Sequence, residues 1–258
     1  MTRRRRPDSP CLANASPHPV TTTLFSQIQR LFERTYASVG INLEDCLIDR
    51  SRCRQLSRLA GAQARELSEL ARTFLRAADG RLHIGIYYSR WLIDQLERHD
   101  PRAALSDANI RCLIAFVEEI NHALHAALAF QRGLRELDDE AFVRHLELQA
   151  GVDTYLVLLL FVSFLRKPQK VSRSDRRWLR FHLFARRDPQ AYRDVTLRGR
   201  YRETGMLAAR YTAFLDSLND LRRLEEIRLF HALDYERKRS HILALPPPRR
   251  RRRGGTTD

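Results

Sequence analysis

The sequence predicts a mainly α-helical protein of the α+β type with one small β element, and three observations support this fold class. Hydrophobic residues make up 43% of the 258 residues, which is enough to bury a sizeable core. Most of the chain repeats its apolar residues at intervals of three and four, the period of an amphipathic helix. A single segment, 81–88, instead alternates its apolar residues Leu82, Ile84, Ile86 and Tyr88, which is the period of a strand.

Two helices are expected before this strand. The first begins after Thr21–Thr23, whose hydroxyl groups can cap it, and it ends at Gly40. The second is expected from about residue 51 to residue 78, and the Asp79-Gly80 turn signal separates it from the strand. Its inner face carries six apolar residues at helical spacing: Leu56, Leu59, Leu67, Leu70, Phe74 and Leu75.

After the strand, helices are predicted up to residue 130 with one interruption. Ser89 can cap the first of them, and the Asp100-Pro101 step ends it, because a proline disfavours helical backbone in the residue before it. Ser106 can cap the second helix.

The rest of the chain is also predicted to be helical. A helix that begins at the acidic residues 138–140 contains the longest apolar run, 155–165. Because this run is too short to span a bilayer, we expect it to be a buried core helix. A long helix over 201–233 is expected to break near Asn219, and a last helix covers 235–245.

About half of the formal net charge of +15 lies near the two ends, in Arg3–Arg6 and Arg249–Arg253. We expect disordered basic tails at 1–21 and 246–258 around one mostly helical domain at 22–245. The four cysteines form no CxxC pair, and no signal peptide is apparent. A soluble cytoplasmic protein of bacterial type, without a membrane partner, is therefore expected.

One stretch of the predicted helix 106–130 combines ionisable side chains with an apolar background. At 3.6 residues per turn, Glu118, His122 and His125 fall on one face, and Glu119 lies one position round from Glu118. Ionisable groups on a buried helix are costly unless they are paired, hydrogen-bonded or bound to a metal. This stretch is therefore the best candidate for a functional site.

The stretch from Glu118 to His122 reads Glu-Glu-Ile-Asn-His and resembles the His-Glu-x-x-His motif of zincin metallopeptidases. Glu118 stands where those peptidases have their first histidine. The order of strand, short helix and motif helix is also similar to that of zincins. The stretch Glu147–Ala150 resembles the Glu-x-x-Ala element of gluzincins, so the resemblance covers about residues 80–165. Bacterial helical proteins of uncharacterised function with the same Glu-Glu-x-x-His are similar as well.

This resemblance implies a divalent metal held by Glu118, His122 and Glu147. Glu119 would then be the general base that activates a water for hydrolysis of a peptide-like bond. Two carboxylates and one imidazole form a harder and more anionic ligand set than that of zincins, so it suits zinc less and iron or manganese more. The protein is then either a metal-dependent hydrolase or a non-catalytic descendant that binds no metal.

Two other interpretations of the same residues stay open. In the first, Glu118 and Glu119 are half-exposed and pair with basic neighbours, while His122 is a core histidine satisfied by a carboxylate. In the second, Glu119 and His122 form the Glu-x-x-His unit of a di-iron helical bundle, although the sequence has no second such unit. Four further residues could line the pocket. We expect His125 and His145 instead to be surface or helix-pairing histidines, and Tyr201 and Tyr211 to pack in the core.

The alternative class of function is a basic interaction module over residues 173–202 that binds nucleic acid or a protein partner. Arginines interleaved with aromatic residues are what single-stranded nucleic acid requires, for phosphate neutralisation and base stacking. The arginine-rich tails would add nonspecific contacts. The spacing of Trp178, Phe181 and Phe184 equally fits a short helix packed on a core. The candidate contact residues are Arg173, Arg176, Arg177, Trp178 and Arg180.

Overall fold

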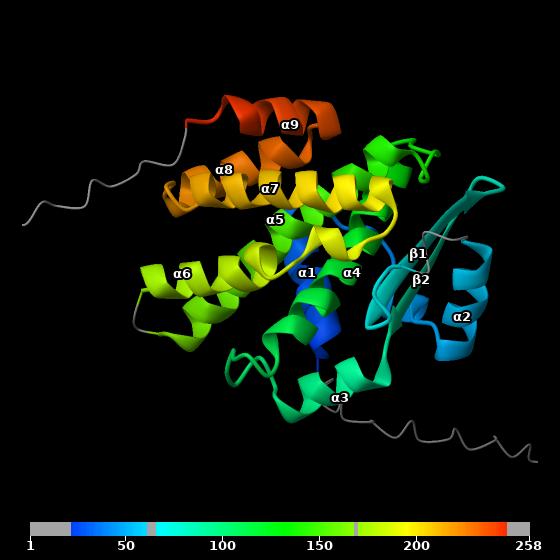
Figure 1. The fold of residues 1–258 in the computed structure, drawn as a ribbon, viewed down its shortest axis with the longest axis horizontal. Coiled ribbons are helices and arrows are strands. Elements are labelled where there is room, and N and C mark those ends of the chain that lie inside the picture. Colours follow the sequence, from blue (N-terminus) through cyan, green and yellow to red (C-terminus); the bar gives the residue numbers. More distant parts are fainter. Residues whose placement is uncertain (1–21, 61–65, 168–169, 247–258) are drawn as a thin grey trace, which may run out of the picture.

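The computed structural model describes residues 22–60, 66–167 and 170–246, and it confirms the mainly α-helical fold class (Figure 1). The predicted tails lie outside these residues, apart from Pro246. The helices in chain order are α1 (Leu24–Thr35), α2 (Arg50–Leu59), α3 (Arg90–Arg98), α4 (Ile110–Gln131), α5 (Glu140–Leu165), α6 (Arg173–Arg180), α7 (Val195–Leu215), α8 (Asp220–His231) and α9 (Tyr235–Ala244). Three short turns of other helical types are η1 (Leu43–Cys46), η3 (Phe181–Ala185) and η4 (Pro189–Ala191).

The two longest helices, α4 and α5, pack against each other at the centre of the fold. Ile120 and Leu124 of α4, and Tyr155 and Leu158 of α5, are completely buried. Each helix is long and apolar enough to cross a membrane by length and composition alone. In each, 67% of the most apolar window is buried inside the fold, so an interior position accounts for the hydropathy of both.

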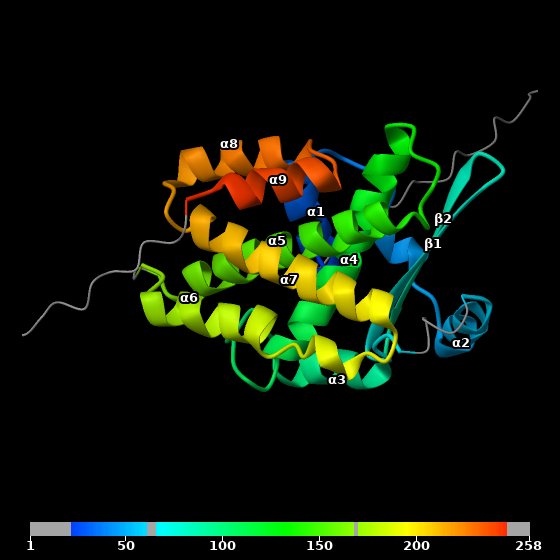
Figure 2. The same cartoon turned by 45° about the horizontal axis from the view of Figure 1, so that its top comes forward.

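The remaining helices cover this central pair. Helices α1 and α3 pack on α4, whereas α6, α7 and α9 pack on α5. Figures 1 and 2 show α8 and α9 together beside α7. A separate apolar cluster joins these C-terminal helices, and in it Tyr211 of α7 stacks on Phe230 of α8 with ring centroids 4.0 Å apart. The predicted break is confirmed, since Asn219 caps α8 by accepting a hydrogen bond from the backbone N–H of Arg222.

The predicted helix over 51–78 is wrong in its second half. Helix α2 ends at Leu59, and Ala71–Ala78 forms strand β1, which pairs antiparallel with β2 (Arg81–Tyr88). The turn between them has positive φ angles of 50° at Asp79 and 71° at Gly80, the backbone of a tight two-residue hairpin turn that Asp-Gly favours. Segment 81–88 is therefore a strand as predicted, but it is not the only one.

Two hydrogen bonds attach the hairpin to the backbone of α4 near Glu119. Thr73 of β1 donates a hydrogen bond to the carbonyl oxygen of Glu119 at 3.1 Å, and Tyr88 of β2 donates to that of Phe116 at 2.8 Å. Its turn end extends beyond the helices (Figure 2). The attachment places β1 beside the candidate residues of α4.

Candidate functional site

The predicted site residues come together between α4 and α5. His122 lies one turn after Glu119 on α4, and its Nδ1 atom is 3.7 Å from Glu119 Oε2. The other ring nitrogen, Nε2, is 3.8 Å from Oε2 of Glu147 on α5. This Nε2 atom is buried and has no hydrogen-bond partner among the residues that the structure describes. Glu118 is close enough for its charge to interact with those of His122 and Glu147.

These four side chains lie at a cavity of about 770 Å³, which we call the acidic cavity. Its other walls come from 66–73 before and within β1, and from 186–192 around η4. A cavity of this size with a few converging polar groups is typical of a binding or active site. The acidic cavity is therefore the candidate functional site.

Two residues outside the predicted set hold the acidic side chains. One nitrogen of the Arg187 guanidinium donates to both carboxylate oxygens of Glu118. The hydroxyl of Tyr201, on the first turns of α7, donates to Glu147 Oε1 at 3.0 Å, and Tyr192 stacks on its ring with centroids 4.8 Å apart. Tyr201 thus fixes Glu147 through one oxygen and leaves the other facing His122.

The electrostatics of the site favour positive charge on His122 itself. Burial alone would lower the pKa of His122, but the carboxylates of Glu147, Glu119 and Glu118 outweigh it and raise this pKa to about 9. Burial also raises the pKa of Glu118, against the opposing effect of Arg187. At neutral pH three carboxylates therefore share the site with the Arg187 guanidinium and the His122 imidazolium, and a metal ion bound to His122 would have to displace its proton.

The residues fit a divalent cation in part. His122 Nε2 and Glu147 Oε2 face each other without a bridging hydrogen bond, whereas Glu118 is engaged by Arg187. Among the described residues, no group of three or more His, Cys, Asp or Glu side chains is placed to hold a metal ion. The structure therefore brings together two of the three predicted ligands and turns Glu118 toward Arg187.

A second polar cluster, the buried network, lies deeper between the helices. Asp153 of α5 accepts hydrogen bonds from Tyr36 (2.5 Å), Asn121 (2.7 Å), His125 (2.9 Å) and Gln149 (3.0 Å). Burial would raise the pKa of Asp153, but the hydrogen bonds from His125, Tyr36 and Gln149 lower it below its usual value. His125 therefore serves this network and lines neither the acidic cavity nor the groove described below.

Helix α9 adds a lysine to the buried network. Lys238 is completely buried, and its Nζ donates to Gln149 Oε1 at 2.5 Å and lies 3.3 Å from His145 Nε2. Burial lowers the pKa of Lys238 to about 7, against the opposing effect of Asp153. Burial and the charge of Lys238 lower the pKa of His145 to about 2. His145 is thus a neutral partner of the network.

The basic stretch 173–202 does not form one free basic surface. Arg176 and Arg180 both donate to Asp216, the residue directly after α7, and Trp178 packs partly buried against the apolar core. Only Arg173 and Arg177 of the five predicted contact residues are exposed. The helical spacing of the aromatic residues thus reflects packing for Trp178 and Phe184, while Phe181 stays half exposed.

Comparisons with models of protein families, with curated proteins and with solved structures find no match for this chain.

Proposed function

We propose that the protein is a metal-dependent hydrolase of peptide-like bonds whose centre is the acidic cavity. One observation carries the proposal. The buried Nε2 atom of His122 has no hydrogen-bond partner among the described residues and lies 3.8 Å from Glu147 Oε2. Two ligands of one tetrahedral zinc ion lie roughly 3.4 Å apart, because each is about 2.1 Å from the metal. This pair is therefore close to the spacing of two metal ligands.

The four acidic and imidazole side chains would have different roles in the reaction. His122 and Glu147 would hold the cation, with Tyr201 orienting Glu147 as a hydrogen-bond donor behind a metal ligand does. When bound, the cation supplies Lewis-acid chemistry that polarises a carbonyl group. Glu119, half-buried beside His122, is placed to accept a proton from water, and Arg187 stabilises the ionised form of Glu118.

Metal content tests this function. The purified wild-type protein is expected to retain about one equivalent of zinc, iron or manganese after dialysis, because an imidazole and a carboxylate converge in an anionic site. His122→Ala is expected to hold less than about a tenth of an equivalent. His83→Ala, on the exposed face of β2, is the matched control and should keep the wild-type content.

Mass spectrometry would measure the metal content of the wild type, His122→Ala and His83→Ala. Less than about a tenth of an equivalent in the wild-type protein, even after incubation with each metal in turn, would contradict the proposal. Equal metal content in wild type and His122→Ala would contradict it as well.

A further inference from the structure

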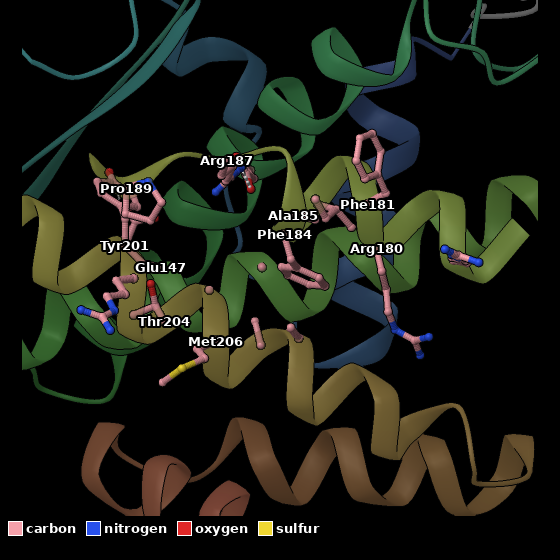
Figure 3. A pocket seen from close by; sticks show the side chains of 18 residues that line it. Glu147, Arg180, Phe181, Phe184, Ala185, Arg187, Pro189, Tyr201, Thr204 and Met206 are labelled. Carbon is pink, nitrogen blue, oxygen red and sulfur yellow. Dashed lines mark hydrogen bonds and ion pairs between the residues drawn. The ribbon is translucent and has the colours of Figure 1, made fainter. Parts of the chain in front are cut away.

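A second cavity of about 620 Å³, which we call the apolar groove, adjoins the acidic cavity. The two cavities share Glu118, Glu147, Arg187, Pro189 and Tyr201 as lining residues. Figure 3 shows Glu147, Tyr201 and Pro189 at one end of the groove, and Phe181 and Arg180 at the other. The groove is therefore an extended channel that leads away from the candidate metal ligands.

Small residues of α7 form one side of the groove. Gly205, Ala208 and Ala209 are spaced so that they share a helix face, and all three line the cavity. A Cβ atom added at Gly205 would meet nothing within 4 Å. At Gly151 of α5, in contrast, an added Cβ would lie only 3.1 Å from the Cβ of Ala208. Close packing of α5 on α7 thus ends where the groove is open.

The opposite side carries larger apolar side chains from the π-helical turn η3. Phe184 and Ala185 lie between the two ends of the groove, and Phe181 stands at its far end (Figure 3). Phe181 is 52% exposed and Met206, on α7, is 64% exposed. Single exposed apolar residues are ordinary, but several that line one cavity mark a binding site for an apolar group.

The charged groups of the groove differ in whether they have partners. Arg180 and Arg187 are engaged by Asp216 and Glu118. Arg177 and Arg202 also line the groove, and neither makes an ion pair or hydrogen bond through its side chain with the described part of the chain. Because Arg177 lies one helical turn before Phe181, it belongs to the end of the groove away from Glu147.

We propose that the apolar groove binds a single apolar chain ending in a carboxylate, with the carboxylate on Arg177 and the chain leading toward Glu147. Arginine pairs with a carboxylate through two parallel hydrogen bonds, and an unpaired guanidinium beside an apolar surface is complementary to such a ligand. As the substrate class of the hydrolase, such a chain would carry the peptide-like bond at its end beside Glu147, and that part of the assignment rests on the proposed function. Binding of a carboxylate-ended chain in the groove does not depend on the proposed function.

Binding of a fluorescent fatty acid, cis-parinaric acid, tests the groove. Gly205→Leu is expected to weaken binding at least tenfold, because the new side chain fills space that is open in the wild-type protein. It should also fold well, since replacing glycine inside a helix favours the helix. Gly199→Leu in the same helix lines neither cavity and should bind as the wild type does.

The position of the carboxylate has its own test. Arg177→Gln is expected to weaken fatty-acid binding about tenfold through loss of a charge-assisted hydrogen bond, whereas Arg202→Gln should leave it within about twofold. The methyl ester of the same fatty acid should bind the wild type as weakly as the acid binds Arg177→Gln. Each methylene added to a saturated competitor should strengthen binding about fourfold while the chain still fits.

Equal binding by wild type and Gly205→Leu would overturn the groove as the site. Equal affinity for acid and ester would overturn the role of Arg177. His122→Ala separates this inference from the proposed function, because it should lose the metal and keep the fatty acid. If the protein binds the fatty acid but never a metal, only the proposed hydrolase function is contradicted. If it binds a metal but no fatty acid, only the proposed role of the groove is contradicted.

Discussion

Replacing Asp153 with alanine is expected to lower the free energy of unfolding by about 3–5 kcal/mol, because it leaves several buried hydrogen-bond donors unpaired at about 1–3 kcal/mol each. Asp153 is only 2% exposed and accepts hydrogen bonds from four side chains, Tyr36 directly after α1, two on α4 and one on α5. Without it, Tyr36 and Asn121 lose their acceptor in the core, and Lys238 loses a negative charge that opposes the effect of burial on its pKa.

Urea denaturation followed by circular dichroism would measure this loss. Asp138→Ala is the matched control, because Asp138 is an exposed loop residue, and it should change the free energy of unfolding by less than about 0.5 kcal/mol. A loss below about 1 kcal/mol for Asp153→Ala would show that the buried network contributes little to stability.

The second large expected effect is a pH-dependent contribution of Lys238 to the free energy of unfolding. The pKa of Lys238 is about 7 in the folded protein, against about 10.4 in an unfolded chain. Between these values the unfolded state binds more protons than the folded state, so this lysine makes the free energy of unfolding rise with pH. Conversely, its unfavourable contribution is fully present below pH 7.

The comparison with Lys238→Met isolates this effect. The free energy of unfolding of the wild type, minus that of Lys238→Met, should increase by about 2 kcal/mol from pH 7 to pH 9. Lys170→Met is the matched control, because Lys170 is exposed, and it should change the free energy of unfolding by less than about 0.5 kcal/mol. A constant difference for Lys238→Met would mean that the buried amine keeps an ordinary pKa.

Local patterns predicted most of the helices but not the first strand. The leucines of 56–70 happen to follow a helical period, which concealed the change to strand after Leu70. The Asp79-Gly80 step held the missing signal, because this dipeptide favours a hairpin turn and so requires a strand on both sides. The breaks at Pro101 and Asn219 were predictable because they depend on single residues and their neighbours.

In the candidate site as well, some residues were predictable from the sequence and others only from the packed structure. Glu119 and His122 share a helix face by spacing alone, and the resemblance of Glu147–Ala150 to the Glu-x-x-Ala element predicted a partner on the next helix. The sequence favoured core packing for Tyr201 and did not single out Arg187, because the roles of both depend on how the segment between α6 and α7 folds back over α4. The buried network draws on Tyr36 directly after α1 and on α4, α5 and α9, and only the packed structure joins them.

The ion pair between Arg187 and Glu118 lines both the acidic cavity and the apolar groove. A ligand in the groove that drew Arg187 away would leave Glu118 free to face a cation beside His122. By thermodynamic reciprocity, any factor by which groove occupancy strengthens cation binding must equal the factor by which the cation strengthens binding in the groove. Titrating either ligand in the presence of the other would measure whether the shared ion pair couples the two cavities.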